Sequence, residues 1–96
     1  LAGAIRDHQR ATIVGEQTFG KGSVTVLHPL SDGSAINVTS GRWLTPSEQM
    51  IEGKGITPDI VVSITEEDRA DGRDPQLDRA LDVLREGLAR SADRAA

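Results

Sequence analysis

The sequence predicts an α/β (α+β) fold, in which a β-hairpin and a mixed sheet are flanked by helices. Three observations lead to this prediction. Residues 11–14 and 60–64 are short apolar runs rich in β-branched side chains, which is typical of buried strands. Residues 23–39 alternate apolar and polar side chains around a glycine turn. Residues 74–88 repeat leucine at helical spacing, so helices and strands both contribute to the layers.

The first element is the helix predicted over residues 1–8. Leu1, Ala4 and Ile5 fall on one face at helical spacing, and His8 extends the same face. No N-cap residue precedes the helix, as expected for a helix that has already begun. His8 is interpreted as a polar residue at the helix end, with a catalytic base as the alternative. The strand predicted at 11–14 follows directly.

A hairpin is predicted next, with strands over 23–30 and 34–39. Residues 31–33 form the turn, in which Gly33 tolerates a positive φ. Gly41 is expected to mark a β-bulge near the end of the second strand.

Trp43 follows the hairpin and is interpreted as core or packing surface, with a substrate-facing role as the alternative. A second turn is predicted at 45–47 and an ordered, irregular loop at 52–59, because glycines and a proline recur there. This loop holds Lys54, a second lysine between two glycines. It therefore serves as an internal comparison for Lys21.

The C-terminal segment contains the clearest helix. Residues 65–73 are acidic and polar, and are interpreted as a partly helical connection. Asp74 is a good N-cap residue and Pro75 suits the first helical position. An apolar stripe follows and is expected to dock on the sheet; its members are Leu77, Leu81, Leu84 and Leu88. Residues 89–96 are expected to fray.

Composition excludes several classes of function. Ninety-six residues make one small domain at most, and 36% hydrophobic content is low for a free-standing one. A net charge of −4 and only two aromatic residues argue against nucleic-acid binding. Without cysteine, and with His8 and His28 far apart, a metal site is not expected. No apolar run approaches the roughly 20 residues of a membrane span, and the natural start is expected upstream of Leu1.

Residues 15–24 read Gly-Glu-Gln-Thr-Phe-Gly-Lys-Gly-Ser-Val and place Lys21 between Gly20 and Gly22. Such a lysine lies either on a solvated turn or in a site where glycines let a ligand or another backbone approach closely. The spacing also resembles a phosphate-binding P-loop, but that motif opens a helix. The segment that follows here has the β-branched alternation of a strand, so a nucleotide site is disfavoured.

This stretch resembles the lysine segment of the carboxyl-terminal processing proteases, the tail-specific S41 peptidases. The resemblance continues through three later blocks, Pro29-Leu-Ser-Asp-Gly-Ser-Ala35, Leu44-Thr-Pro46 and Gly53-Lys-Gly-Ile-Thr-Pro-Asp59. It extends through residues 72–77 into the terminal helix, and thus covers nearly the whole chain.

The resemblance implies a serine endopeptidase with a Ser/Lys dyad that cleaves proteins at or near their C-termini. Its core is of the ClpP/crotonase type and is usually preceded by a PDZ domain that binds the substrate C-terminus. Lys21 matches the general base, and needs a water-poor pocket to lose its proton. Gly20 and Gly22 would leave room for serine and substrate. No cofactor is expected.

Two departures from the family pattern affect the site. The family serine lies before Leu1, and the serines at 23, 31 and 34 do not match its position. Thr25 occupies the position of a glutamine thought to orient the lysine, so its shorter side chain is the candidate orienting group. Residues 1–88 are therefore expected to be the C-terminal part of the catalytic domain, which is inactive alone.

Two alternatives remain open at this point. A non-catalytic peptide-binding or scaffolding relative is favoured only by Thr25. An autonomous binding domain is disfavoured by the low hydrophobic content. The expected partners are substrate C-termini, the upstream part of the catalytic domain and a PDZ domain, and self-association is a further alternative. The resemblance implies an extracytoplasmic location, periplasmic or membrane-anchored.

Overall fold

The computed structural model describes residues 1–95, which fall into two compact units. The first unit comprises Leu1–Ala11 and Gln17–Thr57, and the second comprises Thr12–Glu16 and the residues from Pro58 onward. Each unit contains helix and strand, which confirms the α/β prediction. One correction concerns the sheet: the described strands form two separate two-stranded sheets, one parallel and one antiparallel, in place of one mixed sheet.

The first unit begins with helix α1 (Ala2–Asp7), close to the helix predicted over 1–8. Its buried residue is Gly3, where a Cβ atom would lie 2.9 Å from Thr45 Cγ2 and 3.4 Å from Ile56 Cδ1. Thr45 and Ile56 are themselves only 4% exposed. The small core of this unit therefore forms where the helix backbone meets these two side chains, and it depends on the absence of a side chain at Gly3.

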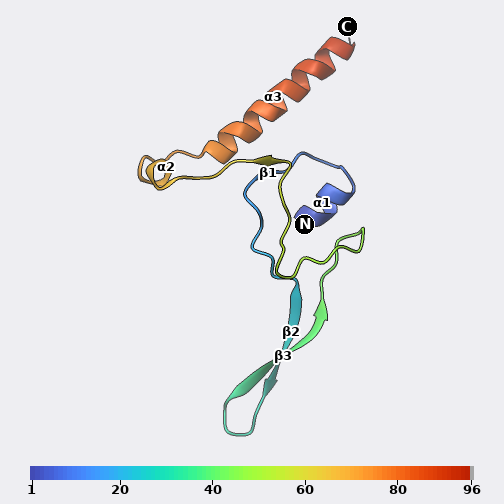
Figure 1. The fold of residues 1–96 in the computed structure, drawn as a ribbon, viewed down its shortest axis with the longest axis vertical. Helices are drawn as coiled ribbons and strands as arrows, with labels where there is room; N and C mark the ends of the chain where they lie inside the picture. Colours follow the sequence, from blue (N-terminus) through green and yellow to red (C-terminus); the bar gives the residue numbers. More distant parts are fainter. Residues whose placement is uncertain (96) are drawn as a thin grey trace. The chain divides into compact units, whose positions relative to one another are not determined.

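The hairpin consists of β2 (Ser23–Pro29) and β3 (Ala35–Arg42), paired antiparallel as predicted (Figure 1). The Asp32 carboxylate closes the turn, since it accepts from the backbone amide and the hydroxyl of Ser34 at 3.0 and 2.5 Å. The register shifts where Val24 pairs with Gly41 and the next pair joins residues 25 and 39. This shift confirms the bulge predicted at Gly41.

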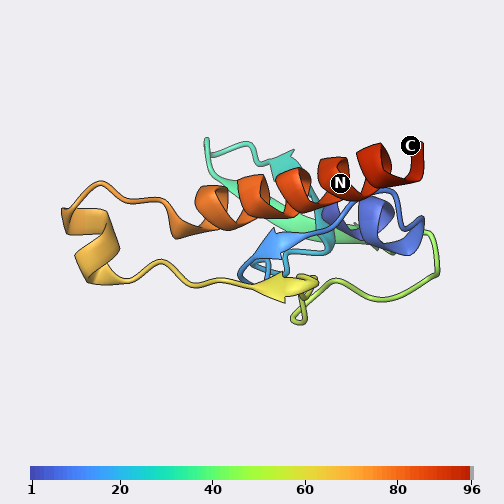
Figure 2. The same ribbon diagram turned by 90° about the horizontal axis from the view of Figure 1, so that it is seen from above.

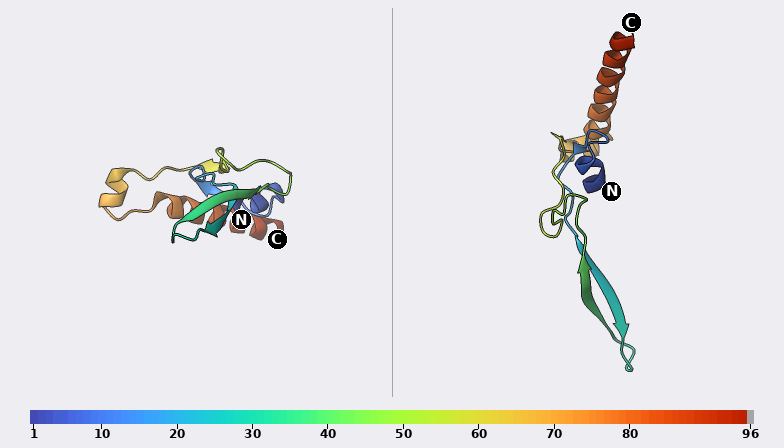
Figure 3. Two further views of the ribbon diagram at one scale, coloured as in Figure 1. Left: turned by 90° about the horizontal axis from the view of Figure 1, so that it is seen from below. Right: turned by 90° about the vertical axis from the view of Figure 1, so that its right-hand side faces the viewer.

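The hairpin extends as a two-stranded arm from the loops of its unit (Figure 3, right). Its large apolar side chains are about half exposed, and they come from both strands: Val26, Leu27, Ile36 and Val38. A ribbon of two strands cannot cover its own faces, because each face has no second layer. In residues 1–95 the hairpin is therefore held mainly by its ladder.

The second unit pairs β1 (Val14–Gly15) with β4 (Ile60–Val61) in parallel. β1 shares only Val14 with the predicted strand 11–14, and β4 covers only the first two residues of the predicted 60–64; side chains bond the backbone groups next to both strands, and the Ile13 amide donates to the Asp59 carboxylate at 2.8 Å. The Glu16 carboxylate accepts from the Ile64 amide at 3.2 Å. The Gln76 side-chain amide donates to the Val62 carbonyl at 2.8 Å.

Helices α2 (Glu66–Ala70) and α3 (Pro75–Ala95) complete this unit (Figure 2). The first lies within the segment predicted to be partly helical, and a capping box of Thr65 and Asp68 starts it. The second begins at Pro75 as predicted. It continues through Ala95, so the fraying expected from residue 89 is not seen up to that point, and residue 96 lies outside the described part.

The apolar stripe of α3 is not docked as expected. The Gln76 side chain lies beside Gly15 of β1, where an added Cβ atom would be 3.8 Å from its Cδ atom, and its hydrogen bond to the Val62 carbonyl fixes the start of the helix. The four leucines of the stripe nevertheless remain 38–69% exposed. Within the described residues the small parallel sheet is too short to cover them. Among residues 1–95, none of the helices combines the length and the hydropathy that a membrane-spanning segment needs.

Candidate functional site

Lys21 is held by a close contact between two glycine-rich loops. At Gly20, whose φ is +89°, a Cβ atom would lie 2.8 Å from the backbone nitrogen of Gly55. At Gly22 it would lie 2.5 Å from the backbone nitrogen of Glu52. Distances this short exclude any side chain at either glycine. The glycines thus let another backbone approach closely, while the room that they would leave for serine and substrate stays a prediction.

Hydrogen bonds join the same two loops. The Gly53 amide donates to the Gly20 carbonyl at 2.9 Å, and the Gly22 amide donates to Glu52 Oε2 at 2.6 Å. The Gly22 carbonyl in turn accepts from the Trp43 amide at 2.5 Å. The backbone on both sides of Lys21 is therefore fixed. Glu52 was missed by sequence reasoning, because an exposed glutamate in a loop gives no sign that it pairs with a distant amide.

The two Gly-Lys-Gly segments of the chain thus lie against each other. The Gln17 side-chain amide donates to the Lys54 carbonyl, and the Ile56 amide donates to Thr18 Oγ1 at 2.7 Å. The Thr18 amide donates to the Ile56 carbonyl at 3.0 Å. The segment around Lys54, treated above only as a comparison for Lys21, is therefore part of its support.

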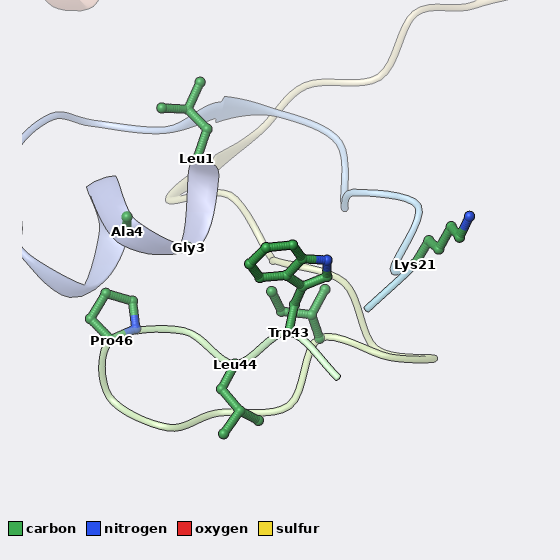
Figure 4. Close-up of a pocket in the computed structure, with 8 residues that line it drawn as sticks. Leu1, Gly3, Ala4, Lys21, Trp43, Leu44 and Pro46 are labelled. Atoms are coloured by element: carbon green, nitrogen blue, oxygen red, sulfur yellow. The ribbon is translucent and has the colours of Figure 1, made fainter. Parts of the chain in front are cut away.

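The Lys21 amine itself does not lie in the water-poor pocket that was expected. Lys21 is exposed, and its amine makes no hydrogen bond or ion pair within residues 1–95. In Figure 4 its side chain extends away from Trp43 and from α1. The loops fix the lysine backbone, while groups that would exclude water from the amine are not found in the described part of the chain.

Thr25 is not brought to Lys21. It lies in β2, is exposed, and pairs across the ladder with Thr39. The bulge precedes it, because the register shifts between Val24 and Thr25. No hydrogen bond joins its hydroxyl to the Lys21 amine among the residues described, so the orienting contact stays a prediction.

A cavity of about 390 Å³ lies beside this loop in the first unit (Figure 4). Apart from Lys21, the residues that line it are of apolar types, and they lie on two sides of the cavity: Leu1, Gly3 and Ala4 on one, and Trp43, Leu44, Pro46 and Ile51 on the other. The Trp43 side chain lies between α1 and the Lys21 loop in Figure 4. The residue remains 61% exposed, so of the two parts of its simplest interpretation, core or packing surface, it does not fit the core.

Asp7 joins the two sides of this cavity. Its carboxylate accepts from the Ser47 amide at 3.0 Å and from the Ser47 hydroxyl at 2.8 Å. The Thr45 hydroxyl, and then these two donors, hold the pKa of Asp7 far below its usual range. Arg6 adds a hydrogen bond of 2.6 Å to Gln49 Oε1. The end of α1 is thereby fastened to the turn at 45–48, as sequence reasoning did not foresee.

Histidine chemistry finds no support in this arrangement. His8 caps the C-terminus of α1, where its backbone amide donates to the Ala4 carbonyl, and it is exposed. His28 lies exposed on β2 opposite Ile36. No group of three acidic or histidine side chains suited to a metal ion occurs among residues 1–95.

Comparisons with known proteins match the part of the chain that contains the Lys21 loop and the cavity. A family model described as peptidase family S41 matches residues 1–62. The carboxy-terminal-processing protease of Bartonella bacilliformis is 55% identical over 62 residues, which are 65% of this chain and 14% of that protein. The carboxyl-terminal-processing protease of a Synechocystis species is 47% identical over 92 residues, 93% of this chain and 22% of that protein.

A solved structure, that of a photosystem II D1 C-terminal processing protease, superposes with a TM-score of 0.59 at 44% identity. The superposition covers 65% of this chain and 16% of that one. This chain therefore spans less than a quarter of the length of each of these three proteins.

Proposed function

This chain belongs to peptidase family S41, and we propose that it forms the lysine-bearing part of a serine endopeptidase that cleaves proteins at or near their C-termini. The observation that carries the proposal is the match over residues 1–62, a region that includes the fixed Gly20–Gly22 segment and the adjoining cavity. The names of the relatives, carboxyl-terminal-processing proteases, suggest the same activity.

Lys21 is the proposed general base. Its neutral amine accepts the proton of a serine hydroxyl as the serine oxygen attacks the substrate carbonyl, and the resulting ammonium then protonates the leaving amine. A base in this role has to be held in place, and the hydrogen bonds to Gly20 and Gly22 supply that support. Thr25 is the proposed orienting residue.

The nucleophile is proposed to lie outside residues 1–96. Ser31 and Ser34 flank the hairpin turn, beyond the seven residues of β2, which span roughly 20 Å from the Lys21 loop. Ser47 is engaged by the Asp7 carboxylate. Ser23 begins β2 and has no hydrogen bond to Lys21 in the described chain. On this proposal the isolated chain does not hydrolyse peptides.

The setting of the enzyme is part of the same proposal. We expect a PDZ domain to deliver substrate C-termini, the upstream part of the catalytic domain to supply the serine, and the protease to work outside the cytoplasm. No cofactor takes part in this chemistry, because the proton moves only between serine, lysine and the leaving group.

The test compares two lysines in the full-length protein. Lys21→Ala is expected to lower turnover of an unfolded protein substrate by at least about 10³-fold, because members of a dyad act as a unit. Lys54→Ala, in the matching Gly-Lys-Gly segment, should lower it less than about threefold. Urea unfolding of both variants checks that they fold. Equal effects of the two substitutions would reject Lys21 as the base.

A second candidate is a non-catalytic relative that binds peptides. The exposed amine of Lys21 and the absence of a contact to Thr25 in residues 1–95 favour it. Peptide binding by the full-length protein, measured by fluorescence anisotropy, with no cleavage detectable by mass spectrometry, would establish this candidate over the protease.

A further inference from the structure

The two peptide groups that flank Lys21 are both hydrogen-bonded to neighbouring residues of one loop. The Gly20 carbonyl belongs to the peptide group before Lys21, and it accepts from the Gly53 amide at 2.9 Å. The Gly22 amide belongs to the peptide group after Lys21, and it donates to Glu52 Oε2 at 2.6 Å. Because φ and ψ are the only soft angles between two peptide planes, fixing both planes sets the direction in which the Lys21 side chain leaves the backbone.

Glu52 contributes a side chain to this pair of hydrogen bonds, whereas the other bond joins two backbone groups. Gly22 is buried, so its amide would lose a hydrogen bond that water cannot easily replace if the carboxylate were removed. A carboxylate also accepts such a bond more strongly than a neutral oxygen does. Glu52 is therefore the member of the pair that can be substituted without changing the backbone.

The loop that carries Glu52 is a turn with hydrogen bonds of its own. The Ile51 carbonyl accepts from the amides of Lys54 and Gly55 at 3.0 and 2.8 Å. Gly53 and Gly55 have φ of +74° and +66°, the left-handed conformation that glycine adopts readily. These bonds do not involve the Glu52 carboxylate, so a substitution at Glu52 should leave the turn in place and remove one contact to the Lys21 loop.

We infer that Glu52 is a positioning residue for Lys21: it holds the base in place through the Gly22 amide and takes no part in proton transfer. The inference rests on the proposed function, since it requires Lys21 to be the base.

An effect of the negative charge is the competing explanation, because a carboxylate close to an ammonium favours the charged form of a lysine. The Glu52 and Lys21 side chains form no ion pair among residues 1–95, which disfavours this explanation. Three variants separate the two. Glu52→Gln keeps an acceptor oxygen at the same reach and removes the charge. Glu52→Asp keeps the charge on a side chain that is a methylene shorter, and Glu52→Ala removes both.

The experiment measures kcat and KM of the full-length protein on a peptide copied from a mapped cleavage site of an unfolded protein. Glu52→Gln should keep kcat within about threefold of wild type, because a neutral acceptor makes the same bond more weakly. Glu52→Asp and Glu52→Ala should each lose at least about 10-fold in kcat, because a displaced base slows the chemical step. KM should change less than about twofold in all three variants. An effect of charge would instead spare Glu52→Asp and alter Glu52→Gln.

A double variant separates positioning from a general structural role. In the Lys21→Ala background, Glu52→Ala should lower the residual activity less than about twofold, because no base remains to be positioned. A structural role would lower it as much as in wild type. Asp32→Ala is the matched control, since it removes a carboxylate that accepts from the Ser34 amide at the distant hairpin turn. It should leave kcat unchanged.

Amide exchange at Gly22, followed by mass spectrometry at residue resolution, measures the contact without relying on activity. It should be at least about 10-fold faster in Glu52→Ala than in wild type or Glu52→Gln. If Glu52→Ala does not fold, the order of Glu52→Gln and Glu52→Asp still decides between a hydrogen bond and a charge. The inference is overturned if Glu52→Ala keeps kcat within about threefold, if Glu52→Asp is more active than Glu52→Gln, or if the double variant loses activity additively.

These measurements also separate the inference from the proposed function. An inactive Lys21→Ala variant together with a fully active Glu52→Ala variant would reject the positioning role and leave the proposed protease standing. A fully active Lys21→Ala variant would reject the base itself, and the positioning role with it, even if exchange at Gly22 showed that the Glu52 contact exists.

Discussion

Replacing Gly20 with alanine tests the loop contact that holds Lys21, and Gly33→Ala is its matched control. Both glycines have nearly the same left-handed backbone, with φ of +89° and +88°. An alanine there costs about 1–2 kcal/mol at either position. Around Gly33 nothing lies within 4 Å of the added methyl group, whereas at Gly20 it would lie 2.8 Å from the Gly55 nitrogen and 3.3 Å from the Gly55 Cα atom.

The difference between the two variants isolates the contact. The atoms opposed to Gly20 are backbone and cannot rotate away, so overpacking adds about 1–3 kcal/mol to Gly20→Ala alone. Hydrogen–deuterium exchange of the full-length protein should therefore be about 5- to 150-fold faster at the amides of residues 53–55 in Gly20→Ala than in Gly33→Ala. The Gly53 amide, which donates to the Gly20 carbonyl, is the most direct probe.

Activity gives a second measurement of the same contact. On the proposed function Gly20→Ala displaces the base and should lower turnover about 10²-fold, since small misplacements of catalytic groups are costly. Gly33→Ala, at the distant hairpin turn, should leave turnover unchanged. Equal exchange rates at residues 53–55 in the two variants would refute the reasoning, because the backbone strain is shared and only the contact differs.

The remaining predictions concern two carboxylates whose pKa is lowered. Donors from Thr45 and Ser47 lower the pKa of Asp7 in the folded chain below its ordinary value of 3.8. The ionised carboxylate therefore stabilises the fold above pH 3.8, and this stabilisation is lost as the pH falls towards the lower pKa of the folded state. Between pH 5 and 2, wild type should therefore lose stability more steeply than Asp7→Asn in urea unfolding followed by tryptophan fluorescence; parallel curves would contradict this. In the capping box that starts α2, hydrogen bonds from Thr65 lower the pKa of Asp68. Thr65→Ala removes the side-chain half of this capping box. It should cost about 1 kcal/mol, seen as faster exchange confined to residues 66–70.

Local sequence signals were sufficient where a few neighbouring residues decide the structure. The alternation over residues 23–39 and the glycine at 33 determined the hairpin, and Gly41 marked its bulge. Asp74 and Pro75 fixed the start of α3 within one residue. The limits of β1 and β4 could not be predicted in this way, because they depend on Glu16 and Gln76 reaching across to another segment.

The sequence drew attention to Lys21, whose role stays a prediction, but it did not reveal the contacts that hold the Lys21 loop. The Gly-Lys-Gly motif identified Lys21, and family resemblance gave it a role, yet the reason for the glycines lies in residues 52–55. Asp7 and Ser47 are 40 positions apart, and Glu52 is 30 from Gly22. In the sequence, nothing distinguishes the carboxylate or the donor of either pair from the other acidic residues and hydrogen-bond donors of the chain. Only the folded chain reveals that they meet.

The exposed amine of Lys21 defines what the proposed chemistry requires. A lysine accepts a proton only when neutral, and burial is one of the causes that favour its neutral form. Its two glycines do not supply that burial, because the backbone of residues 52–55 fills the space beside them and Lys21 itself is exposed. On the proposed function, water therefore has to be excluded from the other side of the amine, by the upstream part of the catalytic domain or by the bound substrate.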